Sequence, residues 1–134
     1  MASIQSILIK PSKSKKMNTN EKIAKLLGIE DELIYRSNGE IFYKEIKLDF
    51  LHDRNQQKWI EDKLIKLGYG IIYEYYLDKN PKYWFVEIFD SAYPDSESIV
   101  FKTNESKDLA FISAVEQLID KEHQTAEKSK NNNE

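Results

Sequence analysis

The 134-residue sequence contains no cysteine, two histidines, three prolines and four glycines. The absence of cysteine excludes a disulfide framework, a thiol nucleophile, a Cys-ligated zinc site and an iron–sulfur cluster. The sequence also lacks the G-x-G-x-x-G, P-loop and H-E-x-x-H motifs that bind phosphate groups or zinc. No apolar run approaches the roughly 18–20 residues that cross a bilayer, so we expect no membrane contact. The sequence therefore predicts no cofactor and no catalytic or metal-binding residues.

Charge is unevenly distributed along the chain, whose net charge is −3. The first 20 residues contain four lysines and no acid, whereas residues 21–120 contain 13 bases and 20 acids. The middle of the chain is therefore acidic, with a net charge of −7. Because an acidic surface repels the phosphate backbone, nucleic acid is disfavoured as a partner.

Composition divides the chain into three parts. Residues 1–19 form a basic leader in which Pro11 and a Ser/Lys cluster interrupt a short apolar run, and we expect disorder there. Residues 122–134 form a polar tail that ends in three asparagines and a glutamate, and we expect disorder there as well. The segment between them, residues 20–121, has the length of a single domain.

Three segments have the apolar spacing of amphipathic helices. Asn18, Thr19 and Asn20 are the N-cap candidates for the first helix. Gly28 and Gly68 are suited to end the first and the second, because glycine tolerates the left-handed backbone that follows a helix. The expected helices are Glu21–Leu27, a segment that begins after Asp49 or Asp53 and ends before Gly68, and Ser106 to about Lys121.

Five segments are rich in the aromatic and β-branched residues that favour strands. Asn38-Gly39 and Lys79-Asn80-Pro81 separate pairs of these segments and indicate two hairpins. The expected strands are Leu33–Tyr35, Ile41–Leu48, Tyr69–Asp78, Lys82–Asp90 and Ser98–Lys102. The resulting order, α-β-β-α-β-β-β-α, predicts an α+β fold in which a mainly antiparallel sheet of four or five strands packs with three helices.

The second hairpin has more aromatic residues than one buried face requires. Side chains alternate between the two faces of a strand. In the first strand of this hairpin, Ile72 and Tyr76 therefore share one face. In the second strand, one face carries Trp84, Val86 and Ile88, and the other carries Tyr83, Phe85 and Phe89. Both faces are thus largely apolar, with Glu74 and Glu87 as exceptions. Either helices cover both faces, which is the simpler interpretation, or one face is an aromatic surface that contacts a partner.

If one face is a binding surface, Tyr76, Tyr83, Phe85 and Phe89 are its candidate anchors, because aromatic rings supply large, rigid contact areas. An alternative function for the same rings is stacking of single-stranded bases. That function requires neighbouring cations, and the sequence offers only Lys79 and Lys82, both in the connecting turn.

Catalytic chemistry has few candidate residues. His52 is the only histidine in the expected domain, and a polar residue near a helix start explains it. Asp90, Asp95 and Glu97 cluster before the last expected strand and suggest an alternative function as a metal-dependent hydrolase. Their spacing is not that of an EF-hand, and an exposed acidic loop explains them more simply.

The segment Asp49–Gly68 resembles that of small phage and prophage proteins with an α/β/α sandwich fold. The resemblance extends over residues 20–121 and includes the short first helix. One departure is Leu51-His52-Asp53, where that family often has a tryptophan pair. The resemblance implies a mobile-element origin and no established chemistry. It rests on Trp59, the helix exit Leu67-Gly68-Tyr69, the Ser106-Lys107 helix start, Ala110-Phe111 and Val115-Glu116.

Together these features predict a non-catalytic interaction protein of a phage or other mobile element in the bacterial cytoplasm. Its expected partner is a host protein, for example a nucleic-acid-handling defence nuclease whose basic groove the acidic surface occupies. Asp90, Asp95 and Glu97 are the candidate charged contacts. A homo-oligomer is the other association that the sequence allows.

Overall fold

The computed structural model describes residues 17–93 and 99–132. Within these ranges the chain has an α+β fold with three α-helices and antiparallel strands, as predicted. The strands form two three-stranded sheets, β2-β3-β4 and β5-β6-β7, where a single sheet was expected. The elements are α2 (Thr19–Leu27), the 3₁₀ turn η1 (Glu30–Glu32), β2 (Leu33–Tyr35), β3 (Ile41–Tyr43), β4 (Ile46–Lys47), α3 (Arg54–Lys66), β5 (Tyr69–Tyr76), β6 (Tyr83–Asp90), β7 (Val100–Asn104) and α4 (Lys107–Asn132).

The first two helices end where the sequence predicts and follow candidate cap residues, although α2 begins at Thr19, before the expected Glu21. Asn18 caps α2 in a capping box with Glu21, and Gly28 ends the helix with a φ of 80°. The carboxylate of Asp53 accepts hydrogen bonds from two backbone N–H groups at the start of α3, which selects it over Asp49 as the cap. Gly68, with a φ of 96°, follows the helix.

The expected strand Ile41–Leu48 is wrong as a single element. The backbone of Lys44 has a φ of 57° and turns the chain between β3 and β4, which pair with each other. The Asn38-Gly39 turn that joins β2 to β3 is confirmed, because Arg36 N–H donates to the carbonyl of Glu40 at 2.9 Å. The segment 41–48 is therefore a second, tighter hairpin.

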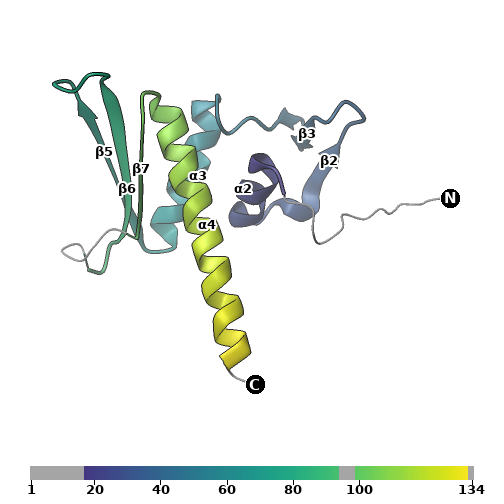
Figure 1. The fold of residues 1–134 in the computed structure, drawn as a ribbon. Helices are drawn as coiled ribbons and strands as arrows, with labels where there is room; N and C mark the ends of the chain where they lie inside the picture. Colours follow the sequence, from purple (N-terminus) through teal and green to yellow (C-terminus); the bar gives the residue numbers. More distant parts are fainter. Residues whose placement is uncertain (1–16, 94–98, 133–134) are drawn as a thin grey trace.

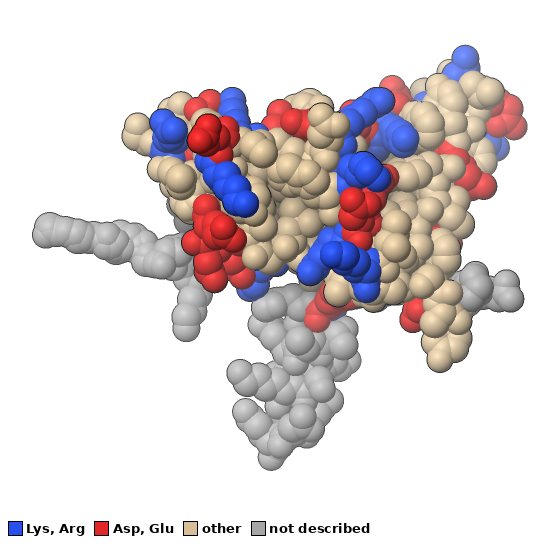
Figure 2. Space-filling view, turned by 180° about the vertical axis from the view of Figure 1, so that it is seen from behind, with Lys and Arg blue, Asp and Glu red and all other residues tan. Residues whose placement is uncertain are grey.

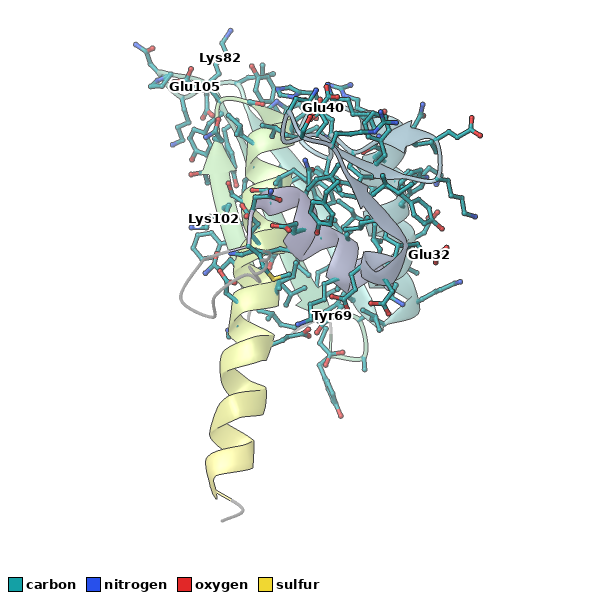
Figure 3. The ribbon with its side chains drawn as sticks, turned by 90° about the vertical axis from the view of Figure 1, so that its right-hand side faces the viewer. Glu32, Glu40, Tyr69, Lys82, Lys102 and Glu105 are labelled. Carbon is teal, nitrogen blue, oxygen red and sulfur yellow. The ribbon has the colours of Figure 1, made fainter. Side chains whose placement is uncertain are left out.

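The sheet of β5, β6 and β7 lies at one end of the molecule, with all three helices on one side of it (Figure 1). Tyr69 pairs with Asp90 and Tyr76 with Tyr83, so β5 and β6 are paired along their whole length. Figure 3 shows Lys82 and Glu105 near one end of the sheet and Tyr69 toward the other, as this antiparallel register requires. The expectation that helices cover both faces is therefore wrong for the described helices.

Helix α4 is the central element of the core. It packs against β6 and β7 on one side and against α2 on another (Figure 1). It was expected to end near Lys121, but it continues to Asn132. Among the helices of residues 17–93 and 99–132, none combines the length and the apolarity needed to cross a bilayer. The expected leader, residues 1–16 in particular, lies outside the described residues.

The core contains one polar side chain, Gln56, among the described buried residues. Its carbonyl oxygen accepts from Asp49 N–H at 2.8 Å, and its amide donates to the carbonyl of Lys47 at 2.8 Å. These bonds fix the segment after β4 to the first turn of α3. The apolar core around it is Ile23, Ala24, Ile41, Leu48, Phe50, Ile60, Leu64, Val86, Ile88, Val100, Ala110, Phe111, Ile112, Ala114, Val115 and Leu118.

Candidate binding surface

The two faces of the β5–β7 sheet have different surroundings. The inner face packs against α3 and α4, and its central residues Val86 and Ile88 are fully buried. The opposite face, called the outer face here, is covered by none of the described helices (Figure 1). Strand alternation and register assign it Gly70, Ile72, Glu74, Tyr76, Tyr83, Phe85, Glu87, Phe89, Phe101 and Thr103.

The four aromatic residues predicted as anchors, Tyr76, Tyr83, Phe85 and Phe89, all lie on the outer face. The ring centres of Tyr76 and Tyr83 are 5.0 Å apart, and those of Tyr76 and Phe85 are 6.4 Å apart. All four side chains are partly buried, although none of the described helices covers them. The structure thus brings Tyr76, Tyr83 and Phe85 into contact and places Phe89 on the same face, opposite Gly70.

Two further apolar residues belong to this surface and were not chosen as anchors from the sequence. Phe101 on β7 is 56% exposed, and its ring centre lies 5.5 Å from that of Phe85. Ile72 on β5 is 39% exposed. Strand alternation alone is enough to place Ile72 on the outer face. Placing Phe101 there also needs the β6–β7 register, in which Phe101 pairs with Glu87.

The outer face carries two carboxylates and, among its ten residues, no lysine or arginine. The phenol of Tyr76 donates to Oε1 of Glu74 at 3.1 Å, and this hydrogen bond raises the pKa of Tyr76 above its ordinary value. Tyr76 therefore stays neutral at physiological pH. Lys82, one of the two cations noted in the sequence, lies at the tip of the hairpin (Figure 3).

Of the three predicted acidic contacts, Asp90 is described, and it is not part of this face. Asp90 ends β6, and its Oδ1 accepts from the backbone N–H of Ala92 at 2.9 Å, which stabilises the turn after the strand. Asp95 and Glu97 lie outside the described residues. Within residues 17–93 and 99–132, no three His, Cys, Asp or Glu side chains are grouped so as to hold a metal ion.

A second cluster of polar side chains lines a pocket of about 160 Å³ between α3, β5 and the start of α4. The phenol of Tyr73 donates to Glu61, and burial together with this hydrogen bond raises the pKa of Tyr73 far above its ordinary value. Tyr73 therefore stays protonated and is unsuited to act as a base. The ammonium group of Lys107 lies 4.5 Å from the centre of the Tyr73 ring. We interpret this cluster as a connection between α3, β5 and α4.

A shallow groove of about 370 Å³ lies between α2, β3 and α3. Leu27, Tyr43 and Trp59 supply apolar surface, and Lys63 and Lys66 of α3 lie beside them. Charged residues of both signs form a band along the α3 side of the molecule (Figure 2). His52, at the start of this region, contacts Asp49 at 3.0 Å and is largely exposed, as a polar residue near a helix start should be.

Comparison of the chain with protein-family models, curated proteins and solved structures found no match.

Proposed function

We propose that this protein is a non-catalytic binding protein whose contact surface is the outer face of the β5–β7 sheet. The observation that carries the proposal is a continuous aromatic surface on the side of the sheet that no described helix covers. Contiguous exposed apolar surface on a monomer usually marks an interaction site. Phe101 and Ile72, the most exposed apolar members, are its expected anchors.

The composition of the outer face defines the chemistry of the partner. Glu74 and Glu87 are the charged residues of an otherwise apolar surface, and residues 21–120 have a net charge of −7. A complementary partner presents an apolar patch bordered by lysine or arginine. The same carboxylates oppose stacking of single-stranded bases, because no cation of the outer face neutralises the phosphates. A protein partner therefore fits better than a nucleic acid.

The proposal includes the biological setting expected from the sequence. In that setting the chain is a phage or mobile-element protein that acts in the bacterial cytoplasm and blocks a host factor. A nuclease with a basic groove beside an apolar patch would be complementary to the carboxylates and the aromatic side chains of the outer face.

The test is capture of partners from a lysate of the source bacterium with the tagged full chain, at low and high salt, read by mass spectrometry. The decisive comparison is between Phe101→Ser on the outer face and Ile34→Ser on β2. Ile34 is a suitable control because it is 51% exposed and lies on the other sheet. We expect Phe101→Ser to reduce capture at least about tenfold, as loss of an interface anchor does, and Ile34→Ser to leave it unchanged.

A second pair of variants tests the charges. Glu74→Gln combined with Glu87→Gln should retain capture at high salt and reduce the difference between low and high salt. If Phe101→Ser captures the same proteins as the unmodified chain, the outer face is not the contact surface. Capture of no protein from the lysate would contradict the proposed function itself.

A further inference from the structure

We infer that β5 pairs antiparallel with β5 of a second copy of this chain, across a twofold axis, to form a continuous six-stranded sheet. This dimer goes beyond the proposed function, since it uses the edge of the sheet and not its outer face. The inference is based on the position of β5 at the edge of its sheet, with the exposed side chains of Leu67 and Leu77 at its two ends.

Within residues 17–93 and 99–132, no strand pairs with the side of β5 that points away from β6. Ile99 N–H donates to the carbonyl of Ile88, so the backbone N–H and C=O groups of Ile88 point toward β7. Those of its neighbour Glu87 therefore point toward β5. Because successive residues point their backbone groups to opposite sides, Ile72, the partner of Glu87, bonds to β6. The N–H and C=O groups of Tyr69, Ile71, Tyr73 and Tyr75 therefore project from the open edge.

The two edges of the sheet differ in their protection. Strand β7 has five residues and includes Lys102 and Asn104, polar residues of the kind that discourage pairing at a sheet edge. Strand β5 has eight residues, no lysine, no proline and a single charged residue, Glu74. In Figure 2 the surface on the right, where this sheet lies, is mostly uncharged. A long, apolar, unprotected edge is typical of a strand that pairs with another chain.

Exposed apolar residues flank this edge at both ends. Leu67, just before β5, is 50% exposed, and Leu77, just after it, is 65% exposed. Tyr75 is 42% exposed although its ring stacks on Trp84 at 4.8 Å. A monomer gains nothing from exposing these side chains together, whereas an added strand would cover them.

The occupant that fits this edge best is a second copy of the chain. In a twofold antiparallel pair with Ile72 opposite Ile72, the start of one strand lies beside the end of the other, so that Leu67 of one copy approaches Leu77 of its partner. The same register places Glu74 opposite Gly70 and keeps the two Glu74 carboxylates apart. The edge is thus self-complementary in shape and in charge.

The test is the mass of the full chain in solution by sedimentation velocity. We expect the unmodified chain to sediment as a dimer of twice the 15.8 kDa chain mass. Ile72→Lys places two lysines opposite each other and should weaken the dimer at least about tenfold. Thr103→Lys is the matched control, because it adds the same charge to the same face on the distant strand β7 and should leave the dimer intact.

Tyr75→Pro and Tyr75→Ala provide a second comparison. Both remove the ring, but only proline removes the outward N–H, so Tyr75→Pro should weaken the dimer further than Tyr75→Ala. Hydrogen exchange supplies a third measurement, since the amides of Ile71 and Tyr73 should be protected in the dimer and exchange rapidly in Ile72→Lys.

Three outcomes would overturn the inference. One is an unmodified chain that stays monomeric up to about 100 µM, a concentration at which a weak dimer forms. Another is a dimer that Thr103→Lys disrupts and Ile72→Lys does not, which would indicate contact through the outer face. The third is rapid exchange of the Ile71 amide in an intact dimer. None of these measurements involves a host partner, so the dimer and the proposed function fail independently.

Discussion

The ring of Phe89 lies directly over Gly70, its partner across the β5–β6 ladder. A Cβ atom at position 70 would lie 2.3 Å from Cζ of Phe89, far inside van der Waals contact. The ring thus occupies the space where any other residue would have its side chain. This close approach, and not a turn or an unusual backbone angle, explains the glycine in the middle of β5.

We therefore expect Gly70→Ala to displace the Phe89 ring and to lower the free energy of unfolding by about 1–2 kcal/mol, as overpacking does. Urea unfolding followed by tryptophan fluorescence measures the change. In a Phe89→Ala background the same substitution should cost much less, because the obstructing ring is gone. An equal cost in both backgrounds would mean that the Phe89 contact is not the cause.

The buried amide of Gln56 gives a second prediction. Gln56→Ala leaves Asp49 N–H without its acceptor and Lys47 C=O without its donor, so we expect a loss of about 2–3 kcal/mol in unfolding free energy. Gln117 lies on an exposed position of α4, and Gln117→Ala should change the same quantity by less than about 0.5 kcal/mol. Equal effects of the two substitutions would contradict the structural role of Gln56.

Alkaline pH should weaken the contact between β2 and α2. Partial desolvation of the Tyr35 phenol, followed by its hydrogen bond to Glu21, raises its pKa from 10.0 to about 12. A pKa raised in the folded state stabilises the protein fully below pH 10, and this contribution is lost as the pH rises to about 12. Tyr35→Phe should therefore be less stable than the unmodified chain at pH 9, and the difference should shrink as the pH approaches 12.

Urea unfolding of both proteins at a series of pH values measures that difference. Other tyrosines titrate in the same range, but they do so in both proteins and cancel. A stability difference that stays constant from pH 9 to pH 12 would show that Tyr35 ionises at its ordinary pKa in the folded protein.

Single-stranded nucleic acid should not bind the outer face. A fluorescent oligonucleotide titrated with the unmodified chain is expected to show no saturable binding, because Glu74 and Glu87 face the phosphates that a stacked strand would bring. Replacing both by lysine should create weak, salt-sensitive binding that Phe85→Ala then reduces. Tight binding by the unmodified chain, lost in Phe85→Ala, would favour the nucleic-acid function over the proposed one.

Several local features could be predicted from the sequence because short-range physics decides them. Asn18 and Asp53 cap helices through side-chain bonds to backbone groups two or three residues away. Gly28 ends α2 because only its own backbone must adopt a positive φ. The alternation of side chains likewise placed Phe85 and Val86 on opposite faces of β6.

Where the helices lie, and how the strands divide between sheets, depends on contacts between distant residues. Because α3 and α4 pack on the same side, Phe85 and Phe101 form a surface, whereas the sequence left open whether helices cover both faces of the sheet. The turn at Lys44 splits one expected strand into two and closes a separate small sheet. The caps of α2 and α3, the Asn38-Gly39 turn and the facing of β5 and β6 thus follow from the sequence alone, whereas the Lys44 turn and the end of α4 do not. The side of the sheet left open and the free edge of β5 follow only from tertiary packing, because one helix layer can cover only one face.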